Sequence, residues 1–341
     1  NLATPSIGGT MNIITDPTAM NRGGKFKQEF GAGGFLKTTA NVNTGIINDK
    51  MAFSATIVRK TGDGMIDKTW TDAWAYYFGA SYAVNDKNRF ELYAIGAPQR
   101  HGQNLYKQNA AVYDPEFAKG MDGYDAEGVW NGKNYPDSKG EFTAPESGFG
   151  SSDPRLFNQN WAPVNSSYKG KQYWYMYGAR TTDRYDPNFI NERENFFHKP
   201  LVNLNHFLTI NNKTRLSTIA YWSGGSGGGT GTYGSIVTRD ATGKSDTYGA
   251  SAQSGKHKFY YGPSPWTRDW NEQIAINGSN STSYWWQGSA RTKQVGESIG
   301  ILRNSINRQS TIGDISKLNY EVNSNLQTQF GIDWRTAGIE H

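Results

Sequence analysis

The chain has 341 residues, 40 glycines, no cysteine and a formal net charge of +5. The lack of cysteine excludes a disulfide framework and any cysteine-based metal site or nucleophile. Mean hydropathy is −0.71, and no apolar run reaches the ~18–20 residues that a membrane helix needs. The basic residues are scattered, which argues against a nucleic-acid-binding surface. Glycine together with 14% aromatic residues is typical of antiparallel β proteins.

Taken in chain order, the expected elements are a short glycine-led segment followed by alternating strands. Gly8 and Gly9, with Asn12 shortly after them, predict a tight backbone approach that leads into a short strand. Period-two alternation then places apolar and aromatic residues on one face and polar residues on the other. It predicts strands at about 24–33, 37–47, 51–60, 74–84, 89–97, 201–210, 214–222, 312–322 and 326–336.

The connections between these strands alternate between short and long. Tight turns rich in asparagine and aspartate are expected at 48–50, 85–88, 211–213 and 323–325. Long loops are expected at about 97–200 and 223–311, with a modest one near 60–73. All short turns therefore fall at one end of the sheet, as in outer-membrane barrels with short periplasmic turns and long extracellular loops. A soluble sandwich has no reason to keep this asymmetry.

Residues 5–15 resemble the end of the plug domain of TonB-dependent receptors, where a Gly-Gly-x-x-Asn-Ile-x-Thr stretch precedes the barrel; Gly8, Gly9 and Asn12 match it. Residues 60–67 and 331–335 resemble later parts of the same family. The resemblance implies an all-β fold: an antiparallel transmembrane β-barrel, here about nine of an expected 22 strands, preceded by the last strand of a plug domain. Residues 1–21 would be the plug tail and 22–341 the N-terminal part of the barrel. Both ends of the chain are expected to be cuts in a longer protein.

The resemblance also implies a function. It is the active transport of a scarce nutrient (a siderophore, a cobalamin-like cofactor or a glycan) across the outer membrane of a Gram-negative bacterium. The expected partners are TonB, contacted through a missing N-terminal region, the outer-membrane lipid, and a small-molecule or glycan ligand. No cofactor is expected. Two alternatives stay open: a passive outer-membrane porin, and a soluble secreted carbohydrate-binding β protein.

Motifs that would indicate catalysis are weak. The Gly-x-Gly-x-x-Gly match at 229–234 is not followed by a helical pattern, so a flexible loop is the better interpretation. Gly225-Ser226-Gly227 is likewise expected to be a linker. No histidine pair has metal-ligand spacing, and no Gly-x-Ser-x-Gly elbow is present. We therefore expect no enzyme, no catalytic residue and no metal site.

Aromatic and arginine residues are concentrated in the two long loops. Such side chains form good surfaces for sugar rings, aromatic chelators and anionic groups. Alternatively, they pack the loops against each other. The ligand-binding candidates are Trp130, Trp161, Trp174, Tyr175, Arg180, Trp266, Arg268, Trp270, Trp285 and Trp286. A separate set near strand ends predicts an interfacial aromatic girdle: Trp74, Tyr76, Tyr82, Trp222 and Trp334.

Overall fold

The protein is described by a computed structural model that covers residues 15–105, 120, 156, 158, 160–168, 170–176, 179–240, 245–249, 266–280, 283–286 and 289–341. Gly8, Gly9, Asn12 and Trp130 lie outside these residues. Among the described residues, no helix is long and apolar enough to cross a membrane.

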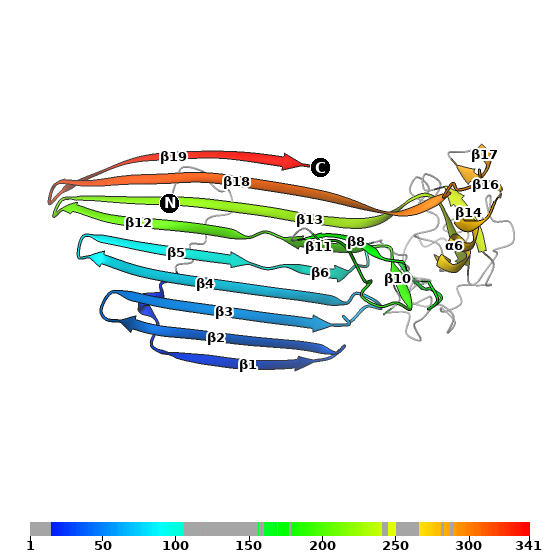
Figure 1. Cartoon of the computed structure of the whole chain (residues 1–341), viewed down its shortest axis with the longest axis horizontal. Coiled ribbons are helices and arrows are strands. Elements are labelled where there is room, and N and C mark those ends of the chain that lie inside the picture. Colours follow the sequence, from blue (N-terminus) through cyan, green and yellow to red (C-terminus); the bar gives the residue numbers. More distant parts are fainter. Residues whose placement is uncertain are drawn as a thin grey trace.

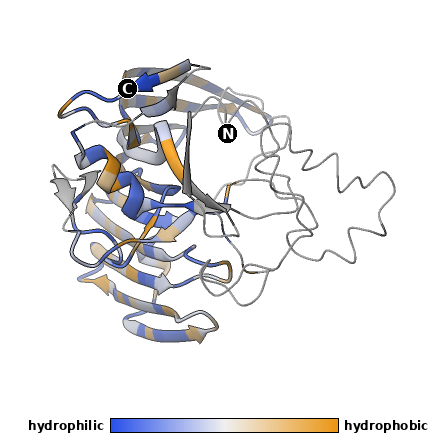
Figure 2. Cartoon of the chain, turned by 90° about the vertical axis from the view of Figure 1, so that its right-hand side faces the viewer, coloured by the Kyte–Doolittle hydropathy of each residue, from blue (hydrophilic) through white to orange (hydrophobic). Residues whose placement is uncertain are grey.

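Nine long antiparallel strands form one curved sheet that does not close into a barrel (Figures 1 and 2). Each overlaps one of the expected strands, so the all-β antiparallel fold is confirmed. Strands β1 and β19 are the two edges. The nine are β1 (Gly23–Gly31), β2 (Phe35–Ile47), β3 (Met51–Gly62), β4 (Thr71–Asn85), β5 (Asn88–Gly96), β12 (Leu201–Asn211), β13 (Thr214–Asp240), β18 (Gly300–Asn323) and β19 (Leu326–Glu340).

The four tight turns lie together at one end of the sheet, on the left in Figure 1. Asn48 adopts a left-handed backbone with φ 49°, which asparagine tolerates better than most residues. The Asn85 Oδ1 accepts the Asn88 amide at 3.0 Å, and the Asn323 Oδ1 accepts the Asn325 amide at 2.9 Å. Side chains that bond the backbone locally favour a turn over a continued strand, so the predicted turns are confirmed.

Two prolines interrupt strands without ending the sheet. Pro98 separates β5 from β6 (Gln99–Gly102), and Pro200 separates β11 (Glu194–His198) from β12. Proline has no N–H to donate, but its carbonyl still accepts: Trp74 donates to Pro98 at 2.8 Å, and Gly224 to Pro200 at 2.9 Å. Because β6 pairs with β4 and β11, and β11 pairs with β13, the sheet continues past both prolines.

The loop expected at 223–311 is wrong at both ends. Strand β13 runs through the glycine tract to Asp240, and residues 214–234 pair continuously with 300–320 of β18. Gly225–Gly227 and the stretch 229–234 are therefore strand, not linker or flexible loop. The glycines accommodate crowded neighbours: a Cβ on Gly227 would lie 2.9 Å from the Phe197 Cβ. The loop expected at 97–200 also contains β6 and β11.

The remaining elements lie beyond the strand ends, on the right in Figure 1. Helix α6 (Trp270–Gly278) is capped at its N-terminus by Asp269, whose carboxylate accepts the Glu272 amide. Aspartate is a common residue at this position. Strands β14 and β15 pair with the end of β13, and the others form pairs among themselves. Their bounds are β7 (Trp161–Pro163), β8 (Gln172–Met176), β9 (Ala179–Thr182), β10 (Phe189–Asn191), β14 (Ser245–Gly249), β15 (Trp266–Arg268), β16 (Ser283–Trp286) and β17 (Ser289–Thr292).

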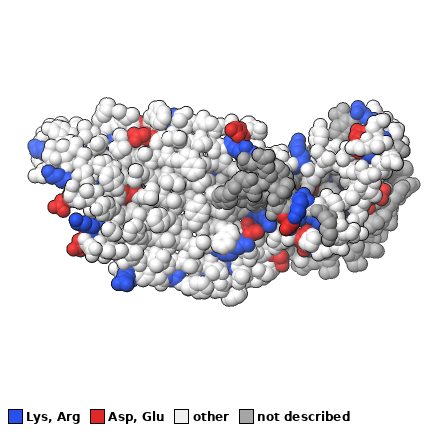
Figure 3. Space-filling model, viewed as in Figure 1, with Lys and Arg blue, Asp and Glu red and all other residues white. Residues whose placement is uncertain are grey.

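The outer face of the sheet, defined by Phe78, Leu204, Trp222 and Ile312, is apolar and exposed. These four side chains lie on interior strands and are 38–53% exposed, so their exposure is not an edge effect. Figure 2 shows apolar and polar residues alternating along the strands. On the face seen in Figure 3, charged side chains gather toward the turns and the loops, with few over the middle of the sheet.

The opposite, inner face is polar and partly covered. Ser54, Ser81 and Glu91 are buried, although they lie on strands whose outer faces are exposed. The short helix η1 (Pro17–Ala19) packs against β2, β3 and β4, and a Cβ on Gly79 would lie 3.1 Å from Pro17. Helix η1 therefore lies on the inner side of the sheet.

Aromatic residues mark two levels of the outer face. Trp74, Trp222 and Trp334 are 41–56% exposed and lie eight or more residues from the turn ends of their strands; Tyr82 and Tyr320, both 44% exposed, lie three residues from the turn ends. Four of the five predicted girdle residues are thus exposed. Tyr76 is half-buried, and its hydroxyl lies 3.0 Å from His198 Nε2.

Candidate functional site

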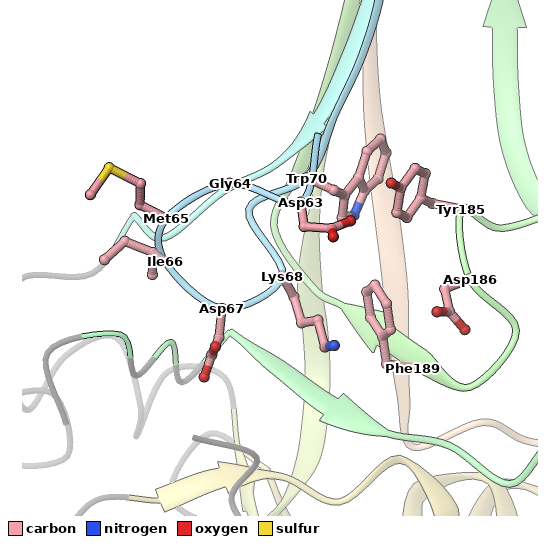
Figure 4. A pocket seen from close by; sticks show the side chains of 10 residues that line it. All are labelled: Asp63, Gly64, Met65, Ile66, Asp67, Lys68, Trp70, Tyr185, Asp186 and Phe189. Carbon is pink, nitrogen blue, oxygen red and sulfur yellow. The ribbon is translucent and has the colours of Figure 1, made fainter. Parts of the chain in front are cut away.

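A pocket of about 310 Å³ lies where the connection between β3 and β4 meets the segment before β10 (Figure 4). It combines aromatic and charged side chains from two distant parts of the chain. Its lining residues are Asp63, Gly64, Met65, Ile66, Asp67, Lys68, Trp70, Tyr185, Asp186 and Phe189.

The connection is held in shape by its own backbone bonds and by one left-handed glycine. Gly64 has φ +81°, and a Cβ there would lie 2.5 Å from the Thr69 carbonyl oxygen. The Thr69 hydroxyl donates to the Ile66 carbonyl at 2.6 Å. Only glycine fits this backbone without strain, so the turn presents its side chains in one arrangement.

One wall of the pocket is aromatic. The rings of Trp70 and Tyr185 stack with centroids 4.0 Å apart and planes 2° apart. The Lys68 ammonium lies 4.9 Å from the Phe189 ring centroid and 5.0 Å from that of Trp161, distances at which a cation is attracted to the ring face. The aromatic groups thus hold Lys68 in place and leave the carboxylates as the main polar groups of the pocket.

Three aspartates give the pocket a negative balance. Asp63, Asp67 and Asp186 line it together with a single cation, Lys68. The pKa of Tyr185 is raised by burial, by the carboxylates of Asp63 and Asp72, and by a hydrogen bond with Asp63. The hydroxyl therefore stays protonated at neutral pH and donates to Asp63. Carboxylates only accept hydrogen bonds when ionised, so the pocket suits hydroxyl or amine donors better than anions.

Buried asparagines tie this connection to the rest of the loops. Asn158 and Asn191 are fully buried. The Asn158 amide donates to the Asp67 carbonyl at 2.8 Å, and the Asn191 amide donates to the Lys68 carbonyl at 3.0 Å and the Gln103 carbonyl at 3.2 Å. Buried amides satisfied in this way fix the backbone around them. The alternation pattern carries no signal for these residues, nor for Tyr185.

Three predicted ligand-binding residues prove to be packing residues. Trp161 is 7% exposed and meets Phe189 edge-on; Trp270 is 5% exposed and donates from Nε1 to the Ile190 carbonyl at 2.9 Å. Arg268 is 2% exposed and pairs with the buried Glu192. All three thus pack within the described loop segments, as the alternative interpretation expects. Their part in ligand binding is a separate matter and stays a prediction; Trp270 also lines the second cavity described below.

The other candidates are spread over the loops. Trp174 and Tyr175 lie in β8 and Arg180 in the paired β9, whereas Trp266 lies in β15 and Trp285 and Trp286 in β16. Their role in ligand binding stays a prediction, as does that of Trp130. Within the part of the chain that the structure describes, no cluster of histidine, aspartate and glutamate is arranged to hold a metal ion.

These features define an all-β protein built on one antiparallel sheet of the kind that forms a barrel wall, with short paired strands and one helix beyond one end of the sheet. No family model and no curated relative matches the sequence. Among solved structures, the chain is similar to the ferric-catecholate import receptor Fiu from E. coli K12. For the closed form the identity is 12% and the TM-score 0.45, with 94% of this chain and 32% of Fiu covered. For the open form the identity and TM-score are the same, and 34% of Fiu is covered.

A second similar structure is the siderophore receptor PiuA from Acinetobacter baumannii, at 7% identity and a TM-score of 0.37. The match covers 93% of this chain and 46% of PiuA. The chain therefore spans about a third of the length of Fiu and less than half that of PiuA. The structural neighbours are transport receptors and not enzymes.

Proposed function

We propose that this chain forms part of the barrel wall of a TonB-dependent outer-membrane receptor that imports a scarce nutrient. The observation that carries the proposal is the exposed apolar outer face opposite a polar inner face. A water-soluble sheet would bury such a face, because contiguous exposed apolar patches are rare on soluble proteins. Lipid is the surrounding that makes this arrangement favourable.

The two aromatic levels support the same proposal. In β4, Trp74 and Tyr82 are eight residues apart, which corresponds to ~26 Å along the strand, or ~20 Å of height at the strand tilt of about 40° that is usual in such barrels. An outer-membrane barrel carries an apolar band about 25 Å tall between two aromatic girdles. Asp314 lies on the outer face opposite Trp334. It is therefore at the aromatic level farther from the turns, where a polar group can reach the membrane surface.

The domain division belongs to this proposal. Residues 1–21 would form the tail of a plug that enters the barrel, and 22–341 the first barrel strands. Support comes from η1, which packs on the polar inner side of β2, β3 and β4, where a plug would lie. TonB would act through a segment outside this chain, and no chemistry on the ligand is proposed.

For the ligand, the pocket at Asp63 favours one of the three nutrient classes. The pocket has three carboxylates and one cation. This negative balance disfavours an anionic metal chelate and suits a neutral polyhydroxylated ligand such as a glycan. Aromatic walls with a few polar groups are typical of such sites. Trp130, Trp174, Tyr175, Arg180, Trp266, Trp285 and Trp286 are proposed as further contacts from the loops.

Fractionation and uptake by the parent bacterium test the function. We expect the intact protein in the outer-membrane fraction, and we expect growth on the imported nutrient to require both this protein and TonB. Uptake that persists without TonB or with a collapsed proton gradient would favour the passive porin. Recovery of the intact protein in the aqueous fraction would favour the soluble carbohydrate-binding alternative.

Substitution of Asp63 tests the pocket. Asp63→Asn keeps the size of the side chain and an oxygen that can accept from Tyr185 but removes the charge and one acceptor oxygen, so glycan uptake should fall while the amount of protein in the membrane stays unchanged. Asp333→Asn, on the distant β19, is the matched control. Equal uptake by the two variants would remove the pocket from the transport path without affecting the membrane assignment.

A further inference from the structure

A second cavity, of about 340 Å³, lies among the loops, and we propose that it binds a small aliphatic carboxylate. It is bounded by α6, the far ends of β13 and β18, and the segment from Tyr168 to Asn191. The elements that enclose it meet at the right of Figure 1. The proposal does not depend on the transport function, because it rests on this cavity alone.

The floor of the cavity is aliphatic. Ile236 is fully buried and belongs to a loop core with Ala162, Val164 and Trp270, against which Ile190 and Ile274 pack. At the mouth, Ile301 and Leu302 remain 49% and 38% exposed. Trp270 turns its only polar atom away toward the Ile190 carbonyl. An alkyl chain entering the cavity would therefore remove apolar surface from water on both sides, which favours binding.

Several polar side chains also line the cavity, and among them the guanidinium of Arg184 carries the donor that matters for a ligand. Its Nη2 donates to the Pro187 carbonyl at 2.6 Å, and its Cζ lies 5.1 Å from the Tyr168 ring centroid. Its Nη1 is shielded from solvent and has no hydrogen-bond partner among the residues that the structure describes. Leaving a shielded, charged donor unmatched is unfavourable, so an oxygen of a ligand at this atom would stabilise the complex.

The case for an anionic ligand rests on the open donor of Arg184 and not on the net charge of the lining, because Arg184 and Glu194 balance once Lys171 is paired. The other cation that lines the cavity, Lys171, is paired with Asp183, whereas no ion pair of the described residues includes Arg184. Glu194 is the one acid among the lining residues. A carboxylate can satisfy the guanidinium with a charge-assisted hydrogen bond, while the aliphatic floor selects a hydrocarbon tail over a sugar.

This cavity is separate from the pocket at Asp63. Strand β10 lies between them, and its consecutive residues Phe189 and Ile190 line the two different spaces. Side chains alternate between the two sides of a strand, so one short strand serves both walls. The two sites therefore offer opposite chemistry: an acidic, aromatic pocket and a cationic, aliphatic cavity.

Calorimetric titration of the intact protein in lipid nanodiscs tests the proposal, with sodium octanoate as the probe and empty nanodiscs as the blank. Octanol and octylamine, which share the tail but lack the carboxylate, are titrated in parallel. Arg184→Gln should weaken octanoate binding about tenfold, the effect of losing one charge-assisted bond of about 1.4 kcal/mol. Arg291→Gln, an exposed arginine outside the cavity, should leave binding unchanged.

A second variant protects the test against misfolding of the first. Ile274→Trp fills the cavity and keeps Arg184, so it should abolish octanoate binding. The proposal is overturned if octanol binds as tightly as octanoate, if Arg184→Gln and Arg291→Gln behave alike, or if Ile274→Trp binds octanoate normally. If Arg184→Gln does not fold, the Ile274→Trp titration and the comparison of octanol with octanoate decide whether the proposal stands.

Discussion

Arg268 and Glu192 form a doubly hydrogen-bonded ion pair that is sealed from solvent, although the two residues are 76 positions apart. Arg268 Nε lies 3.0 Å from one carboxylate oxygen and Nη2 lies 3.0 Å from the other. The side chains are 1% and 0% exposed. Because Glu192 belongs to the first long loop and Arg268 to the second, this pair fastens the two loops together.

Breaking this pair should loosen both loops. Glu192→Gln leaves a buried guanidinium without its counter-charge, which typically costs about 3–5 kcal/mol. We expect faster amide hydrogen exchange throughout β10 and α6 and little change in the sheet. Asp183→Asn, which breaks the exposed pair with Lys171, should change nothing measurable. Equal exchange rates in the two variants would mean that the buried pair does not hold the loops.

A charge on the outer face should be tolerated much less than one on the inner face. Phe78 lies midway between Trp74 and Tyr82 on β4, so Phe78→Arg would place a cation in hydrocarbon at a cost of about 2–4 kcal/mol. Asn205→Arg, on the inner face near Glu91, should cost far less. Urea unfolding from lipid vesicles measures the difference. If Phe78→Arg is as stable as the parent, the outer face does not meet lipid.

The turn at Gly64 should depend on glycine for two reasons. Gly64→Ala would force a left-handed backbone on alanine, at about 1–2 kcal/mol, and would also bring the Cβ against the Thr69 backbone. Gly296→Ala has a similar φ, +77°, but no atom within 4 Å of the new Cβ, so it isolates the first effect. Hydrogen exchange at residues 63–69 in Gly64→Ala should therefore rise more than exchange at residues 294–298 does in Gly296→Ala, and equal local changes in the two variants would exclude a steric role.

Acidification should loosen the segment after β6, which lies beyond the level of Trp74. The pKa of His101 is lowered from 6.5 by burial and by the charge of Lys60. Gln103 Nε2 lies 3.2 Å from His101 Nε2, where it can donate only to a neutral imidazole. Since the unfolded chain binds a proton first, this contribution to stability is present above pH 6.5 and is lost as the pH falls through the lowered pKa.

Hydrogen exchange at residues 101–105, corrected for the intrinsic pH effect, measures this loss between pH 7.5 and 5.5. The same segment supplies the Gln103 carbonyl that Asn158 and Asn191 bind, so their protection should fall together. His101→Gln removes the titrating group and should flatten the pH response. A response that survives in His101→Gln would assign it to another group.

The strands of the sheet and the polarity of its faces could be predicted from sequence. Residues 326–334 alternate strictly, and asparagine or aspartate lies at each tight turn, so the information is local. Alternation weakens where glycine replaces side chains. For this reason local sequence does not predict the continuation of β13 past Trp222. That continuation depends on pairing with β18, which lies about 80 residues further along the chain.

The candidate site depended on long-range packing. Nothing near Arg268 in the chain indicates that it meets Glu192, and nothing near Tyr185 indicates that it stacks on Trp70. Aromatic and arginine residues in loops have the same local pattern whether they bind a ligand or each other. Sequence by itself determined which residues alternate and where the chain turns, because those are properties of neighbouring residues. Only the tertiary structure decided which loop residues are buried, since burial depends on contacts between segments that the chain separates by tens of residues.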